Sequence, residues 1–196
     1  MRIITGALKG RIIPFNARRS GQIRLSSSLL KEAVFSMLGP DLEGLNFLDL
    51  CAGCGQLGLE AYSRGARTAM NEPDQRRYAL LQRLQREWRL EGLELYPLKA
   101  QVLIPWLEDR DLRFDLVYVD PPYEAQLNSI PLSLALLQLL GAGGLLAEGG
   151  WCFVQHQRSL EMPPAAGRLQ RQRQREYGQT TLSLYRAPAS PPPEKS

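Results

Sequence analysis

Short apolar segments alternate with amphipathic ones along most of the chain. Runs rich in β-branched and aromatic residues predict buried strands, and apolar residues at helical spacing predict helices. The expected strands cover residues 46–51, 67–71, 93–98, 114–119 and 151–154. The expected helices cover residues 29–38, 74–89 and 127–140, with a further helical stretch from after Gly58 to about residue 64. Residues 170–176 and 180–185 predict a closing antiparallel hairpin. The alternation predicts an α/β protein with a doubly wound, mostly parallel sheet.

The two ends of the chain differ from this middle part. Residues 1–40 predict a hairpin around Gly6 and Gly10 followed by one helix, which together are too small for a core of their own. We expect this appendage to pack on a domain formed by residues 41–187. The proline-rich residues 188–196 predict a disordered tail.

The most informative stretch is Asp120-Pro121-Pro122-Tyr123, directly after the predicted strand 114–119. Two prolines cannot continue a strand ladder, and ligands of open α/β sheets bind where such strands end. Asp120 and the carbonyl of Pro121 can accept both hydrogens of an exocyclic nucleobase amine, and Tyr123 can stack on the base. A loop with a helix-capping Asp explains the same four residues, so this motif alone leaves both interpretations open.

A second candidate site follows the strand at residues 46–51. Its glycine-rich turn into the next helix contains Ala52, Gly53, Gly55 and Gly58. Glycines let a backbone approach a ligand, and the helix N-terminus supplies bare N–H donors. Asp49 precedes the turn, and Glu72 lies near the distance expected for a ribose-binding acid. Many nucleoside-binding folds share this fingerprint, so it does not choose a cofactor.

Composition limits the cellular compartment and the kinds of site that the chain can contain. The chain has 196 residues and no apolar run long enough to cross a membrane. Its start lacks the apolar region of a signal peptide, and three cysteines are too few for a disulfide scaffold, so we expect a cytoplasmic protein. We also expect it to act as a monomer. Cys51 and Cys54 fit either a redox pair or two small residues in a tight turn. No metal is expected, because a second cysteine pair is missing and the single histidine, His156, is expected to be structural.

The net charge of +4 is concentrated at the two ends of the chain, which suggests a polyanionic partner such as RNA. The candidate RNA-binding residues are Arg11, Arg24, Arg171, Arg173 and Arg175. The last three are spaced by two, so we expect them on one face of a strand. A solubilising surface is the alternative explanation for either cluster.

The pairing of Asp49 and its glycine-rich turn with the Asp120 motif resembles class I S-adenosylmethionine-dependent N-methyltransferases, which have a Rossmann-like sheet. Further stretches resemble bacterial 16S ribosomal RNA guanine-N2 methyltransferases of the RsmD type: residues 1–6, 9–11, 31–38, 57–61, 63–66 and 177–185. The resemblance implies S-adenosylmethionine as cofactor and 16S ribosomal RNA or the small ribosomal subunit as partner. It places the turn at 49–58 on the methionine part, Glu72 on the ribose hydroxyls, and residues 120–123 on the amine.

Three stretches depart from the family pattern. Residues 24–29 lack its proline, its acid and a basic residue, and residues 51–55 read Cys-Ala-Gly-Cys-Gly where the family has Phe-Ala-Gly-Ser-Gly. Residues 99–101 lack the acid that holds the adenine amine. Gln101 is expected to hydrogen-bond the adenine instead. Two alternatives stay open: methylation of DNA adenine or another RNA base, and an RNA-binding module that assists ribosome assembly without catalysis. The sequence leaves open which nucleotide is modified, and whether free RNA or an assembled subunit is the substrate.

Overall fold

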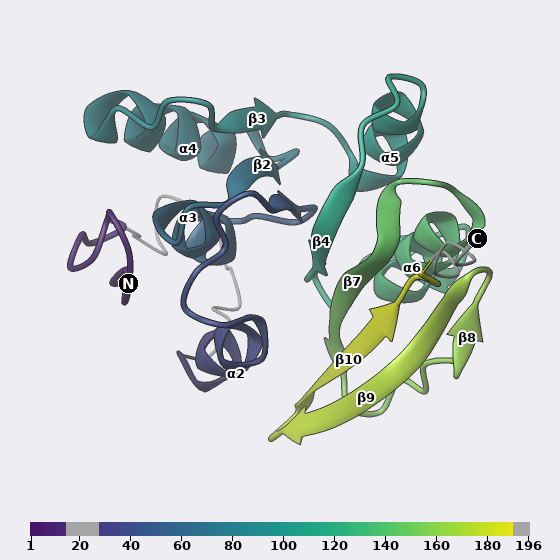
Figure 1. The fold of residues 1–196 in the computed structure, drawn as a ribbon. Coiled ribbons are helices and arrows are strands. Elements are labelled where there is room, and N and C mark those ends of the chain that lie inside the picture. The colour runs from purple at the N-terminus through teal and green to yellow at the C-terminus, as the bar shows by residue number, and fades with distance from the viewer. Residues whose placement is uncertain (15–27, 190–196) are drawn as a thin grey trace, which may run out of the picture.

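This computed structural model describes residues 1–14 and 28–189, and an eight-stranded sheet is the centre of the fold (Figure 1). The elements are α2 (Ser28–Leu38), β1 (Asn46–Asp49), α3 (Gln56–Ser63), β2 (Arg67–Asn71), α4 (Gln75–Trp88), β3 (Glu94–Tyr96), α5 (Ala100–Glu108), β4 (Phe114–Val119), β5 (Gln126–Leu127), β6 (Ile130–Pro131), α6 (Leu132–Ala142), β7 (Leu146–Gln157), β8 (Ala165–Ala166), β9 (Leu169–Tyr177) and β10 (Thr180–Arg186). None of the described helices is long and apolar enough to span a membrane.

The strand order is β3-β2-β1-β4-β7-β10-β9-β8. The first five strands pair in parallel, whereas β10 lies antiparallel to both β7 and β9. The order reverses between β1 and β4, where α/β sheets bind their ligands. The expected doubly wound, mostly parallel sheet with a closing antiparallel hairpin is therefore confirmed.

Apolar side chains of the central strands alternate between two cores, one on each face of the sheet. Leu116 and Phe153 point toward the core that α2 and α3 cover. Val117 and Val154 point toward the core that α5 and α6 cover. The period of two along each strand thus places helices on both faces.

Residues 127–131 do not begin a helix, as their apolar pattern predicted. They belong to the β5–β6 hairpin, and α6 begins only at Leu132. Asn128 and Ser129 have positive φ angles of 51° and 65°, the conformation that a two-residue hairpin turn requires. The hairpin stands directly after the Asp120 motif.

Two further elements differ from the expectation. Helix α5 was not expected, because Pro105 interrupts its helical pattern. Strand β7 begins at Leu146, before the expected strand start at residue 151, and its register with β4 shifts between Phe114 and Leu116. The positive φ of 69° at Gly149 lets the extra residues bulge without ending the strand.

A buried carboxylate fastens the N-terminal segment to the domain. Glu60 on α3 accepts hydrogen bonds from the amides of Ile4 at 2.9 Å and Thr5 at 3.1 Å. It also pairs with Lys31 of α2 at 3.3 Å and with Arg64 at 3.1 Å. The hairpin of residues 1–13, with its antiparallel bridge between residues 2 and 12, packs its apolar side chains against α4. The expected packing of the appendage is confirmed, whereas domain boundaries at 40 and 187 stay predictions.

We expect Glu60→Gln to lower the free energy of unfolding by about 3–5 kcal/mol, the usual cost of breaking a buried ion pair from one side. The control is Glu87→Gln, because Glu87 forms an exposed pair with Arg83 at 3.7 Å. That change should cost no more than about 1 kcal/mol. Urea denaturation measures both, and equal losses would contradict a special role for Glu60.

Candidate active site

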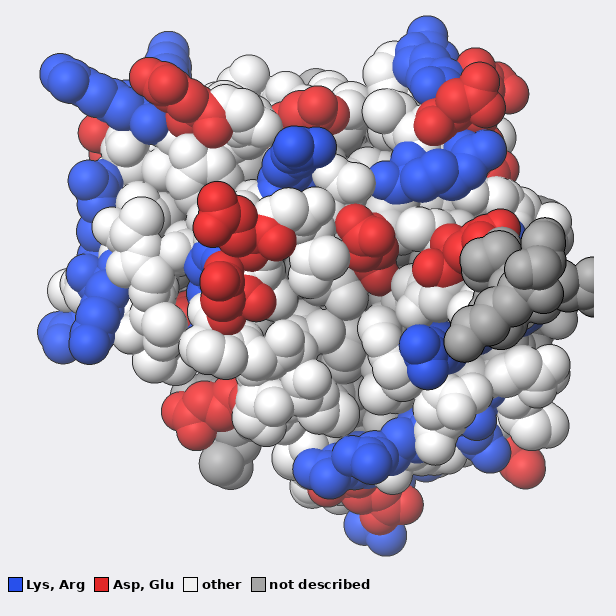
Figure 2. All heavy atoms as spheres, viewed as in Figure 1, with Lys and Arg blue, Asp and Glu red and all other residues white. Residues whose placement is uncertain are grey.

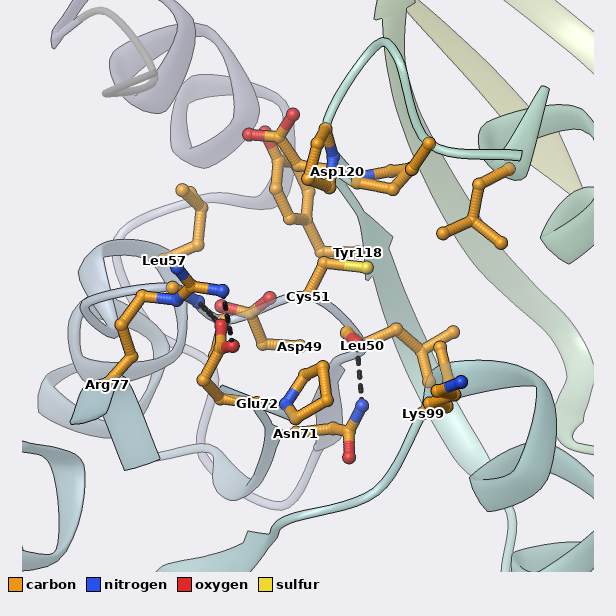
Figure 3. A pocket seen from close by; sticks show the side chains of 18 of the residues that line it. Asp49, Leu50, Cys51, Leu57, Asn71, Glu72, Arg77, Lys99, Tyr118 and Asp120 are labelled. Atoms are coloured by element: carbon orange, nitrogen blue, oxygen red, sulfur yellow. Dashed lines mark hydrogen bonds and ion pairs between the residues drawn. The ribbon is translucent and has the colours of Figure 1, made fainter. Parts of the chain in front are cut away.

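A cavity of about 450 Å³ opens at the carboxyl ends of β1, β2 and β4 (Figure 3). Its walls come from the turn after β1, the end of β2, the first turn of α5 and the segment after β4. The sequence-predicted site residues that line it are Asp49, Ala52, Gly53, Glu72, Gln101, Asp120, Pro121, Pro122 and Tyr123. The structure therefore brings the two candidate sites together in one cavity.

Gly55 and Gly58 are not among the residues that line the cavity. A Cβ atom at Gly58 would lie 2.3 Å from Sδ of Met70, and one at Gly55 would lie 2.7 Å from Cδ2 of Leu81. These glycines let α3 pack closely against its neighbours in this structure. Gly58 still serves the site indirectly, because its N–H donates to Oδ2 of Asp49 at 3.1 Å.

Asp49 is buried at the end of β1, and its second oxygen, Oδ1, has no hydrogen-bond partner of regular geometry in the described structure. The pKa of this carboxyl is raised to about 7, mainly by burial and to a smaller extent by the nearby carboxylates of Asp120 and Glu72. The amides of Gly58 and Cys51 oppose this rise without cancelling it. An unpartnered buried carboxylate oxygen at a cavity wall is suited to a cationic ligand.

Glu72 shapes the turn that forms one wall of the cavity. Its Oε2 accepts the N–H of Gly53 at 2.8 Å, and its Oε1 accepts the N–H of Asp74 and a guanidinium N–H of Arg77, each at 2.9 Å (Figure 3). A carboxylate has about four acceptor positions, so these three donors leave room for one more. Arg77 was not predicted as a site residue, since nothing in the sequence pairs it with Glu72.

Asn71 is a second residue that the sequence analysis missed. It is fully buried at the end of β2 and donates from Nδ2 to the carbonyl of Leu50 at 3.0 Å. Its Oδ1 accepts the N–H of Leu98 at 3.2 Å, so one amide ties the chain after β1 to the chain after β3. A polar residue at the end of an apolar strand, directly before Glu72, was the available signal.

The wall after β4 is held by side chains of the C-terminal strands. The hydroxyl of Tyr123 donates to Oγ1 of Thr180 at 2.7 Å, at the start of β10. Tyr118, which also lines the cavity, donates to Oε1 of Gln155 at 2.6 Å. The antiparallel hairpin therefore positions the aromatic part of the Asp120 motif, a contact that spacing in the sequence does not indicate.

The cysteines are free thiols whose environment disfavours the thiolate. Burial raises the pKa of Cys54 to about 11, and burial together with nearby Asp49 raises the pKa of Cys51. A redox pair needs a lowered thiol pKa, so the structure favours two small residues in a turn. Within residues 1–14 and 28–189, no cluster of three potential metal ligands occurs.

His156 is buried inside the antiparallel part of the sheet. Its Nε2 lies 2.8 Å from Oγ of Ser183, and its Nδ1 lies 2.9 Å from the carbonyl of Gln157. Burial lowers its pKa. The neutral ring thus has a structural place away from the cavity, as expected.

The predicted RNA-binding arginines do not form one group. Arg24 lies outside the described residues, and Arg11 is exposed with its guanidinium 5.2 Å from the ring centroid of Trp88. The expectation that Arg171, Arg173 and Arg175 share one strand face was wrong.

A bulge in β9 at Gln172, opposite the step from Leu184 to Tyr185 of β10, causes this difference. Arg173 and Arg175 pair with leucines of the core under α2, whereas Arg171 pairs with Tyr185 of the core under α6. The Arg171 guanidinium donates to the carbonyl of Met162 at 2.6 Å.

Solved structures show the same fold. A candidate methyltransferase of Escherichia coli, yhhF, superposes with a TM-score of 0.77 and 26% sequence identity, covering 97% of this chain and 99% of that one. An RNA methyltransferase from Salinibacter ruber in complex with S-adenosyl-L-homocysteine gives a TM-score of 0.62 with 14% identity over 87% of this chain and 98% of its own, a likeness of fold alone. The fold is that of a class I methyltransferase.

The sequence comparisons identify the family. A family model described as conserved hypothetical protein 95 matches residues 1–186, and the chain belongs to this family. It is 33% identical over 192 residues to YlbH of Bacillus subtilis (strain 168), described as a candidate rRNA methyltransferase, with 95% of this chain and 98% of YlbH covered. It is 28% identical over 190 residues to ribosomal RNA small subunit methyltransferase D of Escherichia coli (strain K12), covering 96% and 91% of the two chains.

Without a ligand, the ionised form of Asp49 should destabilise the fold. Its folded-state pKa is raised from 3.8 to about 7, so the stability associated with this group is complete below pH 4 and is lost as the pH rises toward 7. Between pH 4 and pH 8, the free energy of unfolding of wild type should fall by on the order of 4 kcal/mol more than that of Asp49→Asn. Denaturation at both pH values measures this difference. The exposed-acid control Asp109→Asn should follow wild type, and parallel profiles for all three proteins would contradict the raised pKa.

Proposed function

We propose that this protein is an S-adenosylmethionine-dependent methyltransferase that modifies the exocyclic N2 amine of a guanine in 16S ribosomal RNA. One observation carries the proposal: a single cavity joins the turn at Asp49 and Glu72 to the Asp120-Pro121-Pro122-Tyr123 segment. Membership in the family and the names of its relatives support RNA as the substrate. No feature of the cavity favours DNA adenine or a purely structural role in assembly.

The residues present fit the cofactor. S-adenosylmethionine carries a sulfonium and an ammonium, and the cavity presents the carboxylates of Asp49, Glu72 and Asp120. The unpartnered Oδ1 of Asp49 would accept from the ammonium, and the remaining capacity of Glu72 would serve the ribose diol. Gln101, half-buried in the first turn of α5, would bond the adenine edge.

The reaction needs orientation more than acid–base chemistry. When bound, the cofactor supplies an activated methyl group on sulfur. Asp120 and the carbonyl of Pro121 accept the two amine hydrogens, which turns the nitrogen lone pair toward the methyl carbon. The proton lost after transfer passes to Asp120 or to water. Tyr123, anchored on Thr180, stacks against the guanine.

The substrate guanine must leave its stack to reach this cavity, at a cost of a few kcal/mol for a paired base. Exposed arginines outside the cavity, including Arg11, Arg173 and Arg175, would hold the surrounding phosphates. We also propose that the protein acts as a monomer on 16S ribosomal RNA or the small subunit.

Asp120→Ala should lower the rate of single-turnover methyl transfer by about 10²- to 10⁴-fold, because it removes the acceptor that orients the amine. RNA and cofactor binding should change far less, because this contact is strongest in the transition state. Transfer to purified ribosomal RNA and to small subunits is measured beside both binding constants, with Asp109→Ala as an exposed-acid control. Equal rates for wild type and Asp120→Ala would remove Asp120 from the mechanism, and a wild type inactive on every RNA would favour the assembly role.

Glu72→Gln should weaken S-adenosylmethionine binding by about 1.5–3 kcal/mol, the range for a hydrogen bond to a charged group. Arg77→Met tests whether the loss comes only from a loosened turn, since it removes the arginine contact but leaves the carboxylate. We expect a smaller loss for Arg77→Met by calorimetry. Unchanged affinity in Glu72→Gln would limit Glu72 to shaping the turn, and tight binding of a nicotinamide dinucleotide would contradict the cofactor assignment.

A further inference from the structure

A second hollow, of about 550 Å³, lies outside the active site between the end of α2 and strand β9. The described residues that line it are Ser36, Met37, Leu38, Trp151, Phe153, Gln172, Arg173, Arg175 and Leu184. We call it the α2–β9 groove. Its apolar floor is formed by the sheet, and its polar rim is formed by β9.

The bulge in β9 gives this groove its charge. Because the register shifts beside Tyr185, Arg173 and Arg175 turn toward α2 while Arg171 turns to the opposite face. Both groove arginines are exposed, and neither forms an ion pair with a described residue. No acidic residue is among the described residues that line the groove. Figure 2 shows Lys and Arg side chains along the region of β9.

The groove also contains the surface that a nucleobase needs. Trp151 is partly exposed and lies beside the apolar side chains of Met37 and Leu38. The guanidinium of Arg186 lies 4.9 Å from the centroid of the Trp151 ring and helps to hold it. Aromatic surfaces next to arginines bind single-stranded nucleic acid without a sequence preference.

A short path joins the groove to the active site. Tyr123 of the Asp120 motif bonds Thr180, and Thr180 pairs with Tyr177 across the closing hairpin. Tyr177, Arg175 and Arg173 follow one another at alternate positions on the same face of β9. Two residues of an extended strand advance about 7 Å, so the arginines begin one such step beyond Tyr177.

We propose that the α2–β9 groove binds the RNA strand next to the target guanine. Arg173 and Arg175 contact its phosphates, and a flanking base lies against Trp151 and the end of α2. The groove would hold the strand while the target base occupies the cavity. This inference rests on the proposed function, because it takes RNA as the substrate. An acidic protein segment is the competing occupant, but the aromatic floor and the path to Tyr123 favour RNA.

The test is RNA binding by the full-length protein over a range of salt concentrations, with protein-free 16S ribosomal RNA and with small subunits. The first variant is the double change Arg173→Ala and Arg175→Ala. The second is Ser36→Glu, which adds a negative charge at an exposed position on the groove rim. The control is Arg83→Ala with Arg86→Ala, which removes the same charge from the exposed face of α4.

The double groove variant should reduce the slope of log affinity against log salt by about 1.4, or about 0.7 for each lost contact with single-stranded RNA. Ser36→Glu should weaken RNA binding as well, whereas the α4 control should keep the wild-type slope. Cofactor affinity should stay at its wild-type value in both groove variants, because no residue of the groove lines the active-site cavity.

A groove variant with the slope of the α4 control would overturn the proposal. So would an effect seen with small subunits but not with protein-free RNA, since that result assigns the groove to a ribosomal protein. Because binding is measured apart from methyl transfer, the groove is tested even if the wild type transfers nothing. Failure of transfer alone contradicts the proposed function, and an unchanged slope alone contradicts the groove.

Discussion

The site depends on the burial of negative charge at one edge of the sheet. Asp49 ends β1 in an environment that opposes its ionisation, and Asp120 and Glu72 add like charge nearby. Protein interiors tolerate such a carboxylate when it is neutral or when a cation completes it. The fold supplies only part of that stabilisation, through the backbone amides of Gly58 and Cys51. A positively charged ligand relieves the unfavourable free energy of the buried Asp49 carboxylate when it binds. This relief strengthens binding of the ligand.

Buried carboxylates also hold backbone segments in place, both at the cavity and away from it. Glu72 accepts the amides of Gly53 and Asp74 and so fixes the turn beside the cavity. Glu60 does the same for the amides of Ile4 and Thr5 on the far side of α3. In both places one side chain accepts hydrogen bonds from two backbone N–H groups that lie outside the helices and strands. Such residues are expensive to remove even where they touch no substrate.

The sequence predicted the parts of the fold that rest on local pattern. The strand at residues 114–119 and its abrupt end at Pro121 were readable, because β-branched runs and prolines act locally. Hydrogen bonds between residues far apart in the sequence could not be predicted. Examples are those that join Asn71 to Leu50 and Leu98, and the one that joins Tyr123 to Thr180. Helix α5 was missed because Pro105 hid a helix that tertiary packing stabilises. Domain boundaries and individual site roles stay predictions.

The arginines of β9 show why spacing alone misplaces charge. Period-two alternation holds only while pairing is regular, and one bulge reassigns Arg171 to the opposite face. Strand β9 also lies next to the edge of the sheet, because its outer neighbour β8 has only two residues. Charged side chains at such an edge prevent unwanted strand pairing. That protective role needs charge anywhere along β9, whereas contact with RNA at the groove needs it on the face toward α2. The position of Arg173 and Arg175, rather than their number, therefore separates the two roles.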